Sequence, residues 1–100
     1  MIARIWRGWT SDALADEYFE LLKRTGVPLY RRTPGNRGIH VLRRSQDGVT
    51  EFLPLTFWDA LEDVRPISGP ELERAYYFPE DARFLLELEP CVRHFEAWTA

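Results

Sequence analysis

Three stretches of the chain have the pattern of hydrophobic and polar residues that is typical of β-strands. The first is Ile2–Trp9, which is rich in β-branched and aromatic residues, and the others are Gly38–Arg44 and Val49–Trp58. Asp47-Gly48 lies between the last two and is a strong hairpin signal. Pro54 conflicts with this pattern because proline cannot donate a hydrogen bond to a strand ladder. We therefore expect a bulge or an unpaired position at Pro54.

Between the first two strands, hydrophobic residues recur at the spacing of one helix face. The stripe consists of Leu14, Tyr18, Leu21, Leu22 and Thr25. Gly26 and Pro28 are expected to stop or kink this helix, with one more turn over Leu29–Thr33. The sequence therefore predicts a first helix that covers one face of the sheet.

The second half of the chain is divided by prolines. We expect a short helix from Asp59 through Val64, which Pro66 interrupts, and a further helix over Glu71–Tyr77. A helical connector over Glu80–Leu88 and a final strand over Cys91–Trp98 are expected to follow. The resulting order, β-α-β-β-α-β, is that of the ferredoxin-like split unit, an α+β fold. The final strand has apolar residues on both faces, whereas a sheet with one wet face alternates more cleanly. We therefore predict that helices cover one face and that a second copy of the chain covers the other, in a homodimer.

Composition excludes several classes of protein. The 100 residues are 45% hydrophobic and 14% aromatic, which excludes a disordered chain. This length predicts one domain, residues 1–100. No apolar run reaches the roughly 20 residues of a membrane span, and the first residues lack the features of a signal peptide. The single cysteine, Cys91, excludes an internal disulfide framework. We expect a cytoplasmic protein with no membrane partner.

The net charge of −3 hides an uneven distribution. Seven basic residues and no acidic one lie between Lys23 and Arg44, which leaves six basic and sixteen acidic residues elsewhere. A nucleic-acid contact is opposed by the pI near 5.4, and we expect no nucleic-acid partner. Two interpretations stay open. Arg32 and Arg37 could hold an anion at a pocket mouth, or the arginines are solvated or pair with the acidic remainder, and the sequence favours the second.

Several motifs along nearly the whole chain carry a resemblance to a known family. They are Ile2-Ala3-Arg4-Ile5-Trp6-Arg7-Gly8, Thr33-Pro34-Gly35-Asn36-Arg37-Gly38, Phe57-Trp58-Asp59, Tyr76-Tyr77-Phe78-Pro79-Glu80-Asp81, Phe84-Leu85-Leu86-Glu87, Glu89-Pro90 and His94-Phe95-Glu96. With them the chain resembles the dimeric α/β-barrel superfamily, and among its members the small proteins grouped with the antibiotic biosynthesis monooxygenases.

The resemblance implies two ferredoxin-like sheets packed face to face as a homodimeric α/β barrel, with a pocket between each sheet and its own helices. Some relatives oxidise polycyclic phenols with O₂ and no cofactor, and others degrade haem, isomerise lactones or have no known activity. The tryptophan near the end of the third strand carries over onto Trp58. The histidine that many relatives have in the second helix is absent from Asp63–Arg74, and the first strand lacks the asparagine of haem-degrading relatives. Haem degradation is therefore not expected, and no cofactor is predicted.

Side-chain chemistry suggests which residues would serve such a pocket. His94 is the candidate base, since imidazole titrates near neutral pH; a histidine hydrogen-bonded at an interface or strand edge is the favoured alternative. Tyr76 is the second catalytic candidate, and the ligand-binding candidates are Trp58, Arg32, Tyr77 and Trp6, although packing explains most aromatic residues. The two histidines and scattered carboxylates match no metal-site spacing. The sequence thus predicts a cofactor-independent monooxygenase acting on an aromatic or polycyclic phenol. The alternative is a non-catalytic binding or structural dimer of the same fold.

Overall fold

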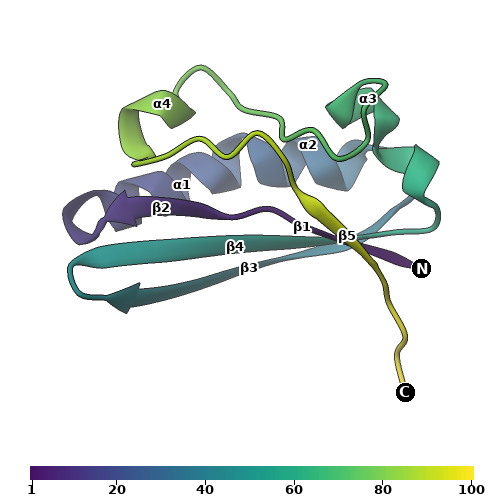
Figure 1. Cartoon of the computed structure of the whole chain (residues 1–100), viewed down its shortest axis with the longest axis horizontal. Helices are drawn as coiled ribbons and strands as arrows, with labels where there is room; N and C mark the ends of the chain where they lie inside the picture. The colour runs from purple at the N-terminus through teal and green to yellow at the C-terminus, as the bar shows by residue number, and fades with distance from the viewer.

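An antiparallel sheet with all helices on one face forms the framework of the computed structural model, which describes residues 1–100 (Figure 1). The strands are β1 (Ile2–Ile5), β2 (Gly8–Ser11), β3 (Asn36–Gln46), β4 (Val49–Trp58) and β5 (Arg93–Glu96). The helices are α1 (Ala15–Arg24), α2 (Gly26–Arg32), α3 (Arg65–Ser68) and α4 (Asp81–Phe84), with 3-10 turns η1 (Asp12–Leu14) and η2 (Leu61–Val64) before α1 and α3. None of the helices is long and apolar enough to cross a membrane.

Strand β4 lies at the centre of the sheet. It pairs with β3 along one edge and with β1 and β2 in succession along the other, and β5 pairs with β1 on the outside. Because β1 and β2 keep one register against β4, from Ile5↔Leu55 to Gly8↔Phe52, they occupy a single position in the sheet. The element order and this strand order together confirm the predicted ferredoxin-like βαββαβ fold.

Pro54 explains why the first strand is divided in two. The Trp6 N–H donates to the Pro54 carbonyl at 3.2 Å, but Pro54 has no N–H to return to Trp6. The ladder therefore loses one bond of this pair, and the strand is interrupted at Trp6–Arg7. This is the unpaired position that the sequence predicts. A bulge at Pro54 is not found, because Pro54 stays in register with Val41; the irregularity of the hairpin lies between Asn36 and Gly38.

The hairpin between β3 and β4 and the first helix also follow the sequence. Asp47 and Gly48 both have positive φ, 55° and 82°, as a two-residue type I′ turn requires. The predicted stripe of α1 is buried at Tyr18, Leu21 and Leu22, and the chain bends at Thr25 into α2 as expected. Local sequence signals therefore determine this half of the fold.

The prediction of a helix over Glu71–Tyr77 is wrong. After η2 and α3 the chain runs without helix through residues 69–80, and the predicted connector over Glu80–Leu88 is helical only in α4. Backbone groups of this irregular segment pair instead with the chain before β5: Ala75 N–H donates to the Pro90 carbonyl (2.9 Å) and Val92 N–H to the Glu73 carbonyl (2.8 Å). Tertiary pairing thus satisfies amides that a helix would otherwise satisfy. The last strand is correspondingly shorter than predicted, at Arg93–Glu96.

Two buried clusters fill the space between sheet and helices. The larger one contains Trp6, Tyr18 and Phe52, and the smaller one contains Trp58, Val64 and Ile67. Gly8 makes room for the larger cluster. A Cβ atom at position 8 would overlap Cη2 and Cζ3 of the Trp6 ring. The glycine therefore allows the indole to lie close against the strand.

The substitution Gly8→Ala should displace the Trp6 ring and lower the free energy of unfolding by about 1–3 kcal/mol, the usual cost of overpacking a core. Chemical denaturation measures this change. Gly26→Ala is the matched control, since its Cβ would meet only Tyr30 Cε2 at an ordinary 3.5 Å. Equal stability of Gly8→Ala and the native protein would contradict the proposed role of Gly8.

Candidate functional site

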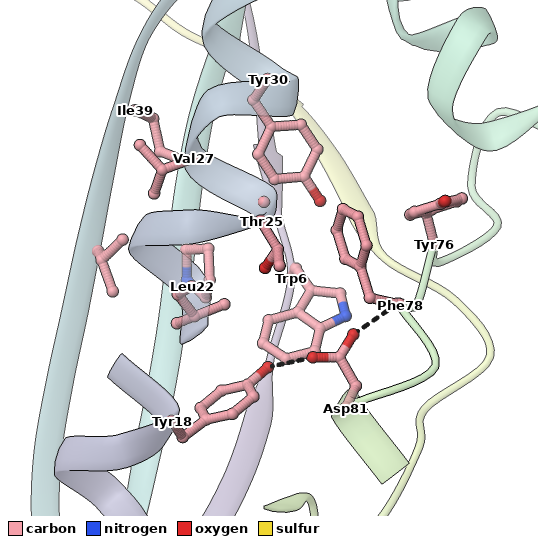
Figure 2. Close-up of a pocket in the computed structure, with 13 residues that line it drawn as sticks. Trp6, Tyr18, Leu22, Thr25, Val27, Tyr30, Ile39, Tyr76, Phe78 and Asp81 are labelled. Atoms are coloured by element: carbon pink, nitrogen blue, oxygen red, sulfur yellow. Dashed lines mark hydrogen bonds between the residues drawn. The ribbon is translucent and has the colours of Figure 1, made fainter. Parts of the chain in front are cut away.

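A pocket opens between the sheet and the helices, on the side of α1, α2 and the irregular segment (Figure 2). Its lining is mostly apolar and comes from almost every element: Trp6, Tyr18, Leu22, Thr25, Gly26, Val27, Tyr30, Ile39, Val41, Pro54, Tyr76, Phe78 and Asp81. Inside the pocket, the centre of a water-sized sphere can occupy a volume of about 20 Å³. This is room for one or two water molecules. As it stands, the pocket is closed to an aromatic ring.

Asp81 is the only carboxylic acid in this lining. Its side chain is buried, and the residue as a whole is 4% exposed. The Phe78 N–H donates to Oδ2 at 2.7 Å and the Tyr18 hydroxyl to Oδ1 at 3.3 Å. Burial nevertheless raises the pKa of Asp81 above that of ordinary aspartate, against the opposing effect of these two hydrogen bonds. The pocket therefore holds a carboxyl group whose proton affinity is increased, as acid–base sites often do.

A raised pKa also means that ionised Asp81 reduces the stability of the fold. In the pH range between the ordinary aspartate pKa and that of folded Asp81, the folded state binds more protons than the unfolded state. Stability therefore falls as pH rises through this range.

The phenol groups of Tyr18 and Tyr30, which line the pocket with Asp81, stay protonated at neutral pH. Burial raises the pKa of Tyr18, and the neighbouring Asp81 charge adds to this effect. Burial likewise raises the pKa of Tyr30, with the positive charge of Arg4 opposing it. Tyr76 stands at the pocket edge, 41% exposed, with its ring edge-on to Phe78. Tyr18 and Tyr30 can therefore donate or accept hydrogen bonds without carrying charge.

A second polar centre lies deeper, on the helix-facing side of β1 and β5. The Arg4 guanidinium is buried, with the residue 3% exposed, and makes no ion pair with a carboxylate. It donates to the carbonyls of Leu72 (2.6 Å) and Arg74 (2.8 Å) and contacts His94 Nε2 at 2.8 Å. Since arginine can only donate, Nε2 must accept, so the neutral His94 proton lies on Nδ1. Nδ1 is buried without a partner.

This contact decides the state of His94. Burial and then the Arg4 charge lower the His94 pKa, and Glu73 only partly opposes them. The imidazole is therefore neutral, and its free lone pair is already used by Arg4. Moreover, His94 is not among the residues that line the pocket. Its predicted role as catalytic base stays a prediction.

The structure brings together some of the other predicted site residues and separates the rest. Trp6 and Tyr76 line the pocket. Tyr77 lies beside it, edge-on to Trp6, with its hydroxyl donating to the Glu89 carbonyl at 2.6 Å. Trp58 is fully buried in the smaller cluster, where its Nε1–H donates to Thr56, and Arg32 is exposed in the last turn of α2.

Asp81 is the pocket residue that sequence reasoning missed. In the sequence it follows Glu80 and has the pattern of an exposed acidic pair at the start of a helix. The signal in the sequence is its position three residues after Phe78. At this spacing an aspartate side chain can accept a hydrogen bond from the backbone N–H of the earlier residue. No group of three or more His, Cys, Asp or Glu side chains in the chain could hold a metal ion.

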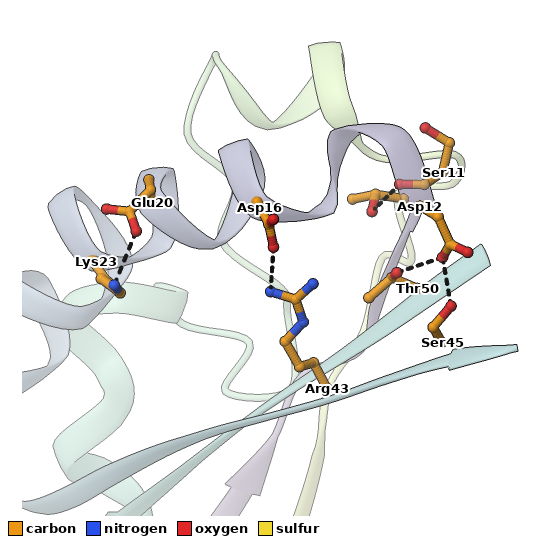
Figure 3. A network of polar contacts seen from close by, with 9 residues as sticks. Ser11, Asp12, Asp16, Glu20, Lys23, Arg43, Ser45 and Thr50 are labelled. Carbon is orange, nitrogen blue, oxygen red and sulfur yellow. Dashed lines mark hydrogen bonds and ion pairs between the residues drawn. The ribbon is translucent and has the colours of Figure 1, made fainter. Parts of the chain in front are cut away.

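The basic segment is largely neutralised within the chain. Lys23 pairs with Glu20, Arg37 with Asp59, Arg43 with Asp16, and Arg44 with Glu51. Figure 3 shows two of these pairs, Glu20–Lys23 along α1 and Asp16–Arg43 between α1 and β3. It also shows Asp12, which accepts from Thr50 and Ser45. The favoured interpretation of this segment, pairing with the acidic remainder, is confirmed for these four residues.

Comparison with known proteins identifies the fold. No protein-family model and no curated protein sequence matches the chain. Among solved structures, it is similar to a Bacillus cereus protein provisionally assigned as an antibiotic biosynthesis monooxygenase, with a TM-score of 0.65 and 14% sequence identity. The match covers 99% of this chain and 96% of the other. At this identity the likeness shows a shared fold, and it confirms the predicted resemblance at that level.

His94→Gln tests the Arg4 contact, because a carboxamide oxygen can accept from Arg4 but does not titrate. In the native protein the lowered His94 pKa means that the unfolded chain binds a proton first as pH falls below about 6.5. The free energy of unfolding should therefore decrease from neutral to mildly acidic pH, and His94→Gln should lessen this decrease. Urea denaturation across this range measures it. His40→Gln is the control, since His40 makes no hydrogen bond to Arg4; an unaltered pH dependence in His94→Gln would contradict the assignment.

Proposed function

We propose that this protein binds a phenolic aromatic molecule in the pocket between sheet and helices and oxidises it with O₂ without a cofactor. The observation that carries the proposal is the buried carboxyl of Asp81 among aromatic rings, in a fold shared with a protein provisionally assigned as a monooxygenase. Asp81 would serve as the base in place of His94, with Trp6 and Tyr76 against the ring. His94 would act as a positioning residue through Arg4.

The small volume of the pocket requires one wall to move when a ring enters. That wall is the irregular segment of residues 69–80, which carries Tyr76 and Phe78. It has no helix to hold it and is attached by the Arg4 bonds and by the pairing with the chain before β5. Outward movement of Tyr76 and Phe78 would admit a ring between Trp6, Tyr30 and Asp81.

The chemistry follows from the placement of the carboxyl. Asp81 accepts the proton of the phenol, and burial of the phenolate among aromatic rings favours electron transfer to O₂. In the overall reaction a phenol and O₂ give a quinone and water. One oxygen atom becomes the new carbonyl, and the other leaves as water with the hydroxyl hydrogen and the hydrogen of the oxidised ring carbon. The raised pKa of Asp81 reduces the difference between its pKa and that of the phenol, and this makes proton transfer easier.

The second face of the sheet supports the proposed homodimer. No element of this chain covers it (Figure 1), and β4 presents Leu53, Leu55 and Phe57 there. Leu42 of β3 and Phe95 of β5 lie on the same face and are 50% and 48% exposed. The total accessible area is 6316 Å², compared with about 5,900 Å² for a monomer of this mass. A second copy, placed sheet to sheet, would cover these residues. The tail beyond β5 also extends away from the helices and carries Trp98, 87% exposed.

Light scattering should give a particle of twice the 11.8 kDa chain mass at micromolar concentration. Leu55→Asp places a charge in the centre of the apolar face and should shift the particle to the monomer mass. Leu61→Asp makes the same change at an exposed leucine of η2 and serves as the control. A native particle of 11.8 kDa would overturn the dimer proposal. A cytoplasmic location stays a prediction from the sequence.

Asp81→Asn separates the catalytic role from folding. The amide removes the buried charge, so the free energy of unfolding at neutral pH should rise, while oxygen uptake with phenol or 1-naphthol should fall by about 10²-fold or more because the base is lost. Asp59→Asn, which changes an exposed carboxylate, is the matched control. Unchanged turnover in Asp81→Asn would contradict its assignment as base.

The alternative is a non-catalytic binding dimer of the same fold, in which the same pocket takes up a phenol without turnover. In that case phenols raise the melting temperature by mass action without oxygen uptake. If no phenol at millimolar concentration changes the melting temperature or consumes oxygen, neither function holds.

A further inference from the structure

The Trp6 indole N–H is a hydrogen-bond donor without an acceptor at the wall of the pocket. Trp6 is 8% exposed, and its Nε1 atom is buried with no partner. Figure 2 shows the indole with this nitrogen on the side of the ring that faces Phe78 and the Asp81 carboxylate. A buried, unpaired N–H is unfavourable, and most such groups in proteins are paired. The donor is therefore available to a molecule in the pocket.

Neighbouring groups of the protein do not satisfy it. The closest competitor is the Tyr77 hydroxyl. Burial raises the pKa of Tyr77, and proximity to the Trp6 N–H is the main opposing effect. The two groups nevertheless do not meet the geometry of a hydrogen bond, and the Tyr77 proton goes to the Glu89 carbonyl. Gly8 lets the ring lie close against the strand, and the larger cluster packs around it. The indole is thus held with its N–H toward the pocket.

Asp81 has hydrogen-bonding capacity left at the same wall. An ionised carboxylate offers about four lone-pair positions, and Phe78 and Tyr18 use two of them, one on each oxygen. A further donor can therefore bind Asp81 without displacing either protein group. The wall presents an unused donor at Trp6 beside an acceptor with free capacity at Asp81.

We propose that the ligand carries two adjacent oxygens on one ring, an acceptor that pairs with the Trp6 N–H and a hydroxyl that donates to Asp81. This inference rests on the proposed function and names its substrate class: a catechol or an ortho-hydroxy carbonyl compound rather than a simple phenol. A site with an unpaired buried donor favours a ligand that pairs with it over an analogue that does not. Trp6 is accordingly the specificity-determining residue.

Catechol and 2-methylphenol provide a matched pair of probes, since they differ by a hydroxyl in place of a methyl group. Calorimetric titration of the full chain should show catechol binding about three- to tenfold more tightly, the effect of one neutral hydrogen bond. In Trp6→Phe, which keeps an aromatic ring but removes the N–H, this preference should disappear. An equal preference in the native protein and the variant would overturn the assignment of Trp6.

The native protein supplies a test that does not depend on the variant folding. Among the four tryptophan indole N–H resonances in a ¹⁵N spectrum, that of Trp6 should move downfield with catechol and not with 2-methylphenol. Assignment comes from the signal lost in Trp6→Phe or from sequential connectivity if that variant does not fold. If both compounds bind and the Trp6 signal responds equally, the pairing is wrong while the proposed function stands. If neither binds at millimolar concentration, both proposals fail.

Discussion

The buried guanidinium of Arg4 is the contact on which the second half of the structure depends. The chain between α3 and β5 forms only one short helix, α4, so packing of a long helix cannot fix it to the sheet. Arg4 does so with two carbonyl contacts and His94, together with the backbone pairing of Glu73 and Ala75 to the chain before β5. The guanidinium has no carboxylate partner. A buried charge needs such compensation, and leaving it unpaired would cost several kcal/mol. Residues 69–80 are thus held mainly by a few directional bonds, and this is why we propose them as the wall that moves when a ring enters the pocket.

The groups that line the pocket have opposite effects on the stability of the fold. Trp6, Tyr18 and Leu22 belong to the larger buried cluster, so this part of the lining contributes to folding. Asp81 acts against it, because burial opposes its ionisation. The unpaired N–H of Trp6 adds a second unfavourable group on the same wall. These two unfavourable groups side by side are the observation that supports the proposed ligand site.

Predictability from the sequence depends on whether the signal is local. Asp47-Gly48 and the stripe of α1 determine their elements by backbone geometry and periodicity, so both are predicted correctly. The helix predicted over Glu71–Tyr77 fails because its amides and carbonyls pair with residues near Pro90, which no local pattern reveals. The site follows the same rule. Trp6 and Tyr76 are large aromatic residues and were identifiable, whereas Asp81 becomes distinctive only through burial by distant elements.

The central claim is that Asp81 is a ligand-binding carboxyl of raised pKa. Carbon-13 NMR of the aspartate carboxyl carbons, titrated with acid in the presence and absence of catechol, tests it directly. The account predicts that the Asp81 signal titrates above the ordinary aspartate pKa of about 3.9 and that it shifts when catechol saturates the pocket. A signal that titrates at the ordinary pKa, or that stays unmoved while catechol binds, would contradict the account.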